Sequence, residues 1–422
     1  MLRISLFTLL LLISSCYTEK AEETRVVSPF LEWENFNPSH DDLFFPIGVY
    51  TQNPEHAGEY RKLGINLYYY LWKGPTAEQV DELRKHGMRL ISEFNEYARE
   101  NLINDTIVAA WTHLDEPDLV KFSKKRLEAM GQEKTKALVK EMWPKMYDEM
   151  NLDNEVYNGW GFGYSPEYCR DQYRDIKGYD TTRPVIMGLS KGVVSYFNGR
   201  GDRKGHREDY REYAEGAGDI LAFDIYPVAY GYPEKMHMVA DGVDSLASWD
   251  AGERPKFVAI ECTFGSPDHE IATPAQIRSE IWMAIIRGAR GIGYFVHNFD
   301  KEGKFVRSDG LLANPEMMEA IEKQNAELLS LRKPIFAKET NEVSLINDEQ
   351  PVDFVAKRVD GYLYIFASAN RPVAIEAEFL VEGMKNGVVE VINENRTLEM
   401  KEGVFTGRFT DSFDVNLYRV EL

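Results

Sequence analysis

The stretch Ile107-Val-Ala-Ala-Trp-Thr-His-Leu114 is mostly apolar on successive residues and runs directly into Asp115-Glu116-Pro117-Asp118. A strand with apolar side chains on both faces is typical of a parallel sheet that helices cover on each side. Seven further runs share this pattern: Phe45–Tyr50, Gly64–Leu71, Met88–Phe94, Pro184–Leu189, Ile220–Tyr226, Phe257–Cys262 and Gly291–His297. Eight such strands joined by helices predict an α/β fold, a closed (β/α)8 TIM barrel.

Helical stretches separate these strands, and the one at Thr76–His86 shows their signals. Thr76 is a capping residue, Leu83 lies at helical spacing, and Gly87 supplies a C-terminal stop. The competing architecture is a doubly wound open sheet, which usually carries a glycine-rich phosphate-binding turn after its first strand. The first strand of this chain has no such turn after it, so the barrel is preferred.

The sequence pattern changes after Pro334. Short alternating segments such as residues 362–368 are then separated by turn residues, which predicts a small antiparallel β-sandwich-like domain. Residues 119–150, rich in Lys, Glu and Met, predict a helical excursion between the fourth and fifth strands. We therefore divide the folded chain into a barrel over residues 41–334 and a β domain over residues 335–422.

The N-terminus has the features of an export signal. The apolar run over residues 4–13 is shorter than the ~20 residues of a membrane span. Ser14-Ser15-Cys16 resembles a bacterial lipobox, which implies lipidation of Cys16; the alternative is an ordinary signal peptide with an incidental cysteine. We expect a signal peptide over residues 1–15 and a flexible tether over residues 16–40. The protein would then be lipid-anchored outside the cytoplasm, on the periplasmic or cell-surface face of a bacterial outer membrane.

Charge and motifs exclude several classes of partner. The chain has 69 acidic and 49 basic residues, a net charge of −20, which argues against binding to nucleic acid or to an anionic membrane surface. The lipid anchor is then the one expected membrane contact. Metal-binding His and Cys spacings are missing, so we expect no metal and no other cofactor. A P-loop is also missing, which disfavours NTPases.

The strand ends supply the candidate site, because barrel enzymes hold their active-site groups there. Two carboxylates stand out: Glu116 follows the fourth strand, and Glu261 lies inside the apolar seventh strand. A buried ionisable group is costly unless it is paired or functional. The structural alternative is an ion pair with an arginine at the barrel rim. Further strand-end candidates for substrate contact are Asp115, Asp224, Tyr226, Trp72, Glu93, Asn95 and His297.

In architecture and in these two glutamates, the chain resembles the glycoside hydrolases of clan A over about residues 45 to 335. The motif-level resemblance rests on Asp-Glu-Pro at residues 115–117 and on Glu261. It implies a retaining, two-step hydrolysis of O-glycosidic bonds in a poly- or oligosaccharide, with Glu116 as acid/base and Glu261 as nucleophile. The two carboxyl groups would then meet across the barrel mouth, ~5 Å apart.

Two positions depart from the pattern of the clan. Asp115 stands where the clan usually has an asparagine before the acid/base, and the eighth strand carries Tyr294, Phe295 and His297 in place of a frequent tryptophan. These departures leave the family within the clan open. Two other classes also stay open: a non-catalytic cell-surface glycan-binding protein on a barrel scaffold, and a barrel hydrolase that uses a metal.

Loop residues suggest how a glycan would be held. Trp72, Trp160 and Tyr226 are expected to form walls of the cleft, because aromatic rings suit the C–H faces of sugars. Their alternative role is packing. The loop over residues 198–207 is basic in an acidic chain, and we expect Arg200 and Arg203 to bind a carboxylate or sulfate of an anionic polysaccharide. A solvated loop balanced by neighbouring acidic residues is the alternative.

Overall fold

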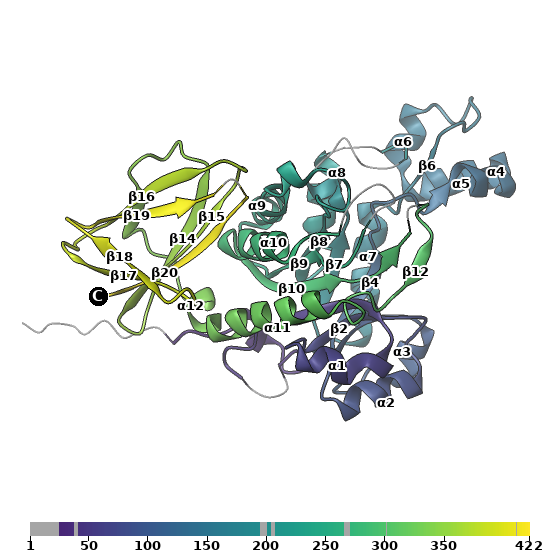
Figure 1. Cartoon of the computed structure of the whole chain (residues 1–422). Coiled ribbons are helices and arrows are strands. Elements are labelled where there is room, and N and C mark those ends of the chain that lie inside the picture. Colours follow the sequence, from purple (N-terminus) through teal and green to yellow (C-terminus); the bar gives the residue numbers. More distant parts are fainter. Residues whose placement is uncertain are drawn as a thin grey trace, which may run out of the picture.

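The computed structural model describes residues 25–37, 41–194, 201–203, 207–265, 271–300, 302–410 and 412–422. Eight parallel strands close into a barrel in the order β1-β10-β9-β8-β7-β4-β3-β2 (Figure 1). They are β1 (Ile47–Gln52), β2 (Leu67–Leu71), β3 (Arg89–Glu93), β4 (Val108–Asp115), β7 (Val185–Leu189), β8 (Ile220–Asp224), β9 (Lys256–Glu261) and β10 (Ala289–Phe295). Each predicted apolar run forms one barrel strand, and the predicted TIM barrel is confirmed.

Helices follow the strands and cover the outside of the barrel. They are α1 (Ala57–Lys62), α2 (Ala77–Lys85), α3 (Glu96–Asn101), α7 (Pro166–Tyr179), α8 (Arg207–Ala214), α9 (Met238–Asp250), α10 (Pro274–Ile286) and α11 (Pro315–Ser330). Thr76 begins α2 as expected, since its side chain accepts the Gln79 N–H at 3.3 Å in a capping box. α10 is buried along nearly its whole length because it packs between the barrel and the C-terminal domain.

The excursion between β4 and α7 leaves the barrel at the C-terminal end of β4. It contains β5 (Phe122–Ser123), α4 (Lys124–Met130), α5 (Gln132–Met142), α6 (Pro144–Glu149) and β6 (Gly161–Phe162). These elements share a small hydrophobic core of their own and project from the barrel, at the upper right of Figure 1. The excursion therefore rises from the end of the barrel at which the strands finish.

Residues before β1 close the opposite end of the barrel. Phe30, in the 3-10 helix η1 (Pro29–Glu32), stacks on Phe36 at 4.6 Å, and both side chains are fully buried. They share a hydrophobic cluster with Leu67 and Ile220, which begin β2 and β8. The prediction of a flexible tether as far as residue 40 is therefore wrong for residues 25–37, because their aromatic side chains complete the core at the barrel floor.

The predicted signal peptide and Cys16 lie outside the described residues. Among the helices that the structure does describe, none combines the length and apolar character that crossing a membrane requires. Cys169 and Cys262 are both buried and both free, so they do not form a disulfide with each other.

The C-terminal domain consists of two antiparallel sheets, reached through α12 (Arg332–Phe336). One sheet contains β13 (Val343–Leu345), β16 (Ile375–Val381) and β19 (Val404–Phe409). The other contains β14 (Val352–Val359), β15 (Tyr362–Ala369), β20 (Val415–Glu421), β17 (Gly387–Val391) and β18 (Arg396–Met400). Phe379 of the first sheet packs on Tyr418 of the second, which confirms the predicted β domain. Trp282 of α10 contacts Phe366 and joins this domain to the barrel.

Candidate active site

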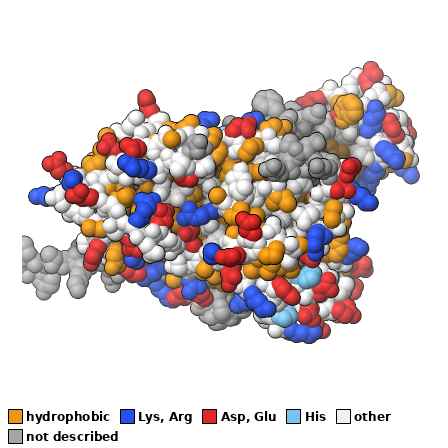
Figure 2. Space-filling model, in the orientation of Figure 1, with side chains coloured by type: hydrophobic (Ala, Val, Ile, Leu, Met, Phe, Trp, Pro, Cys, Tyr) orange, Lys and Arg blue, Asp and Glu red, His pale blue; other side chains and the backbone are white. Residues whose placement is uncertain are grey.

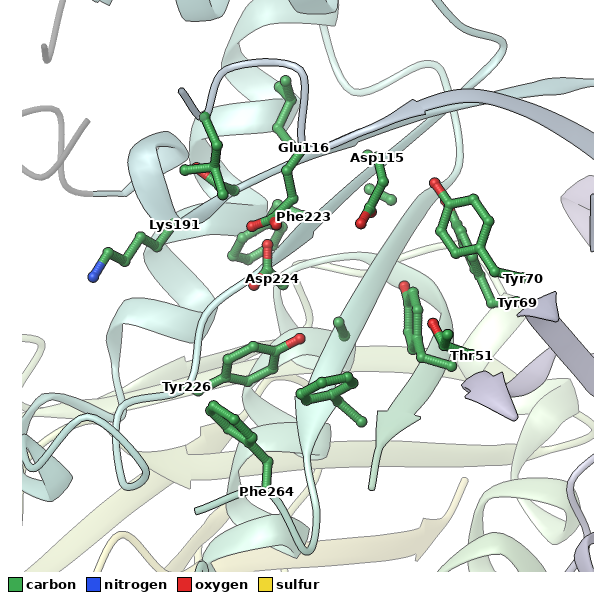
Figure 3. A pocket seen from close by; sticks show the side chains of 18 of the residues that line it. Thr51, Tyr69, Tyr70, Asp115, Glu116, Lys191, Phe223, Asp224, Tyr226 and Phe264 are labelled. Atoms are coloured by element: carbon green, nitrogen blue, oxygen red, sulfur yellow. The ribbon is translucent and has the colours of Figure 1, made fainter. Parts of the chain in front are cut away.

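A cavity of about 320 Å³ opens at the C-terminal ends of the barrel strands. Its acidic lining comes from Asp115, Glu116 and Asp224, whose carboxyl groups lie on one side of the cavity in Figure 3. The aromatic lining is Tyr50, Tyr69, Tyr70, Phe223, Tyr226, Tyr230, Phe264, Phe295 and Phe299. A concave pocket with convergent polar groups among aromatic rings is the usual form of a small-molecule site.

Three residues that line this cavity have a left-handed backbone. The φ angles are 51° at Thr51, 63° at Tyr70 and 42° at Glu116. Such a conformation is uncommon outside glycine, and it is unfavourable for a β-branched or bulky residue such as Thr51 or Tyr70. Strained backbone of this kind costs about 1–3 kcal/mol per residue and is concentrated at functional sites. The strain indicates that the ends of β1, β2 and β4 are shaped for the cavity.

The Glu116 and Asp224 side chains form a hydrogen-bonded carboxyl pair on one side of the cavity. Two carboxyl groups in contact must share a proton, because two negative charges so close cannot both persist. Burial, with the charges of Asp115 and Asp118, raises the pKa of Glu116 to about 7. Burial and the charge of Glu116 raise the pKa of Asp224 well above its ordinary value. The pair therefore retains one proton near neutral pH.

The groups around the pair fix its position and charge. The side chain of Asp115, exposed to the cavity, is hydrogen-bonded by Tyr70. Asp118, behind the cavity, accepts hydrogen bonds from the Ser190 N–H at 3.0 Å, from the Ser190 hydroxyl and from Tyr210. Lys121 opposes the negative charge of the carboxyl cluster, since it lowers the pKa of both Asp115 and Glu116. The cluster is strongly acidic even so.

Glu261 does not line this cavity. Strand alternation would place it on the face of Ala259, which does line the cavity. Its two carboxylate oxygens instead accept the backbone N–H groups of Val228 and Ala229, each at 2.7 Å, and it also pairs with Glu280 of α10. The expectation that Glu116 and Glu261 meet over the barrel mouth is therefore wrong: backbone donors hold Glu261 between the loop after β8 and the helix layer.

The remaining strand-end candidates divide between the cavity and its surroundings. Asp115, Asp224 and Tyr226 line the cavity as expected. Trp72 and His297 lie outside the lining, with their rings 5.5 Å apart, and Trp72 stacks on Phe305 at 5.2 Å. Glu93 is exposed at the end of β3, and Asn95 caps α3 by accepting the Ala98 N–H at 2.9 Å. Asn95 thus caps this helix, and its contact with a substrate stays a prediction.

The loop residues expected to bind an anionic glycan are placed differently. Arg200 lies outside the described residues. Arg203 donates to Asp209 at 2.8 Å and packs its guanidinium over the Trp143 ring at 5.2 Å. Its positive charge is therefore paired with a carboxylate of the protein itself. Trp160 is 72% exposed on the excursion and is not part of the cavity wall. Acidic and basic side chains are intermixed over much of the face shown in Figure 2.

The residues that the structure describes contain no group of three or more His, Cys, Asp or Glu side chains arranged to hold a metal ion. Sequence reasoning missed two features of the site. Asp224 ends an apolar strand and Glu116 directly follows one, and that similar signal could have marked the two as partners. Glu280 is a lone carboxylate in the apolar helix segment 277–286, and this signal was overlooked.

No protein-family model and no curated protein matches the sequence. Solved structures resemble it in fold. A glycoside hydrolase family 5 protein from Bacteroides vulgatus ATCC 8482 has a TM-score of 0.50 at 12% identity, over 90% of this chain and 89% of that one. An Anoxybacillus alpha-amylase has a TM-score of 0.50 at 8% identity, over 89% of this chain and 98% of that one. The chain thus has a barrel fold that two different kinds of glycoside hydrolase also have.

Proposed function

We propose that this protein is a glycoside hydrolase that cleaves an O-glycosidic bond in the cavity at the barrel mouth and retains the anomeric configuration. The Glu116–Asp224 pair carries the proposal, because both carboxyl groups line one cavity and share a proton. A retaining glycosidase needs one carboxylic acid to protonate the leaving oxygen and one carboxylate to attack the anomeric carbon. A pair with one proton and one negative charge supplies both groups.

Glu116 is the acid/base in this proposal, and Asp224 replaces Glu261 as the nucleophile. In the free pair Asp224 holds the shared proton, because burial and the charge of Glu116 raise its pKa well above the ordinary value, whereas burial raises the pKa of Glu116 to about 7. A sugar that separates the pair leaves this proton on Glu116, whose pKa suits a group that gives and takes a proton near neutral pH. Glu116 protonates the glycosidic oxygen while Asp224 attacks the anomeric carbon, so that the C–O bond breaks and a glycosyl ester forms on Asp224. Glu116 then removes a proton from water, the water oxygen attacks the anomeric carbon, and Asp224 is released.

The spacing of the pair favours retention over inversion. Carboxyl groups lie about 5–5.5 Å apart in retaining enzymes and about 6.5–9.5 Å apart in inverting ones. A hydrogen-bonded pair is closer than either, so Glu116 and Asp224 separate when a sugar enters between them. Retention requires the smaller separation, and it needs no space for a water molecule on the far side of the sugar.

The reacting sugar in this proposal is neutral. Asp115, Glu116 and Asp224 would repel a carboxylate or sulfate at the reacting position. Tyr226 stacks on Phe295 at 5.5 Å, and such rings suit the apolar faces of an uncharged sugar. Because Arg203 is already paired with Asp209, the anionic polysaccharide expected from the basic loop is not proposed for this cavity.

The test combines product stereochemistry with rescue by azide. NMR of fresh product from a panel of neutral aryl glycosides and polysaccharides should show the anomer of the substrate. In Asp224→Ala, azide should restore turnover and give a glycosyl azide of inverted configuration. In Glu116→Ala, azide should give a product of retained configuration from substrates with good leaving groups.

Glu261→Gln is the matched control, since it removes the charge of the carboxylate that the resemblance had implied as nucleophile. It should keep turnover and should show no azide product. An inverted product from the wild-type protein would contradict the two-step reaction. Saturable glycan binding without turnover, unchanged in Glu116→Ala and Asp224→Ala, would instead support the non-catalytic glycan-binding alternative.

A further inference from the structure

Glu261 and Glu280 form a second buried carboxyl pair, which the proposed reaction does not use. Both residues have no exposed surface. Within the described part of the chain, the Glu280 oxygens receive no N–H or O–H donor, and its carboxyl group meets that of Glu261. Two carboxyl groups in contact share a proton, so Glu280 is the neutral partner that donates to Glu261. Glu261 is left as a carboxylate with further hydrogen bonds to accept.

Those hydrogen bonds come from the loop after β8. The Val228 and Ala229 N–H groups donate to separate oxygens of Glu261, each at 2.7 Å. Hydrogen bonds to a carboxylate are shorter and about twice as strong as those between neutral groups. A single side chain on β9 thus binds two consecutive backbone groups of a loop that belongs to the neighbouring strand.

The loop that Glu261 binds carries part of the cavity wall. Tyr226 and Tyr230 both line the cavity, and Asp224 lies two residues before Tyr226. The loop is closed on itself by backbone hydrogen bonds, from the Tyr230 N–H to the Tyr226 carbonyl at 3.0 Å and from the Tyr232 N–H to the Pro227 carbonyl at 2.8 Å. A loop that is rigid internally moves as a unit when its attachment to β9 changes.

We propose that Glu261 is a positioning residue: its carboxylate fixes the 226–232 loop to β9 and so sets the orientation of Tyr226 and Asp224 in the cavity, with Glu280 holding the proton that the pair requires. The role of Tyr226 and Asp224 in the cavity rests on the proposed function, whereas the attachment of the 226–232 loop to β9 does not. A glutamine at position 261 has only one acceptor oxygen, and its NH2 group would face a backbone N–H. Glutamine at position 280 can still donate to Glu261.

Hydrogen–deuterium exchange of the full-length chain tests the attachment without any assay of activity. In the wild-type protein, the Val228 and Ala229 amides should exchange as slowly as the strand amides of β9. In Glu261→Gln, exchange over residues 227–232 should become about tenfold faster, while β15 in the C-terminal domain stays unchanged. Glu280→Gln is the matched control and should leave exchange in the loop as it is.

Kinetics on a neutral glycoside add a second measurement, in which Glu261→Gln should raise KM about tenfold and leave kcat within about threefold. Fast exchange of Val228 and Ala229 in the wild-type protein would overturn the proposal, and this measurement needs no variant. Faster exchange spread evenly over all barrel strands in Glu261→Gln would overturn it as well, because that result indicates general destabilisation. If the wild-type protein hydrolyses no glycan, the exchange data still decide the attachment, so the two proposals fail separately.

Discussion

The two carboxyl pairs of the barrel, Glu116–Asp224 and Glu261–Glu280, are similar in chemistry and opposite in place. Each consists of two carboxyl groups in contact, in surroundings that raise the pKa of both members by burial. The first pair lines the cavity. The second has no exposed surface and lies between the barrel wall and α10, where backbone N–H groups occupy the Glu261 oxygens.

The difference shows what makes a buried carboxylate available for chemistry. Glu116 directly follows an apolar strand and Glu261 ends one, and on desolvation alone either could be a reactive acid. The oxygens of Glu261 are already satisfied by fixed donors, whereas those of Glu116 and Asp224 meet each other at the edge of a space large enough for a sugar. Access and unsatisfied hydrogen-bonding capacity therefore separate a reactive pair from a structural one.

The largest expected effect is on the rate. Glu116→Gln should lower kcat/KM for an unactivated glycoside by about 10²–10⁴, the contribution of a general acid. Glu261→Gln should lower it only through the rise in KM. Steady-state kinetics of the two variants, measured side by side, test this difference. A dinitrophenyl glycoside has a leaving group that needs little protonation, so it should restore much of the rate of glycosyl-ester formation in Glu116→Gln. Equal losses in both variants would remove the distinction between the pairs.

The second effect is on stability, and here the substitution at Glu261 should have a larger effect than the substitution at Glu116. Glu261→Ala leaves two buried N–H groups without acceptors, at a cost of about 1–3 kcal/mol each in the free energy of unfolding. Glu116→Gln removes a carboxyl from a crowded acidic cluster and should leave that free energy within about 1 kcal/mol of the wild-type value. Chemical denaturation followed by tryptophan fluorescence compares them. A larger loss in Glu116→Gln would reverse the roles inferred for the two pairs.

The third effect is on pH dependence. The pKa of Glu116, raised by burial and by Asp115 to about 7, is the lower of the two in the pair and places the acidic limb of kcat/KM near neutral pH, since the reaction requires one carboxylate beside the remaining proton. Asp115→Asn removes a nearby negative charge, favours the ionised form of Glu116 and should move the limb to lower pH by up to about 1 unit. Asp148→Asn, exposed on the excursion, is the control and should leave the limb unchanged. A shift to higher pH would contradict the assignment.

The smallest effect concerns the periphery of the cavity. Trp160→Ala should leave kcat/KM for a monosaccharide glycoside within about twofold of the wild-type value, because Trp160 is exposed on the excursion and touches neither pair. A larger effect would place the excursion over the bound sugar and would extend the reactive region beyond Glu116 and Asp224.

Most of the barrel could be predicted from the sequence because its strands are covered on both faces and therefore appear as uninterrupted apolar runs. Thr76 and Gly87 marked the ends of a helix by local chemistry alone. The barrel floor was missed, although Phe30 and Phe36 were visible as aromatic residues in a segment that was otherwise polar. Local polarity suggested a tether, whereas two buried rings were sufficient to fold it against the strands.

The site was predicted in its location and in part of its composition. Strand-end position identified Asp115, Glu116, Asp224 and Tyr226, which all line the cavity. The direction of Glu261 could not be predicted, because it depends on the backbone N–H groups of a loop that begins more than thirty residues earlier. The partner of each carboxyl is likewise set by tertiary contacts, which leave no periodic signal in the sequence.

The aromatic closure by Phe30 and Phe36 has a consequence for handling the protein. The chain enters the fold at the floor of the barrel, and the cavity opens at the other end. An affinity handle or a solid support joined ahead of residue 25 is then held at the end remote from Glu116 and Asp224. Immobilisation through the N-terminus should leave the cavity facing the solution, with its approach unobstructed.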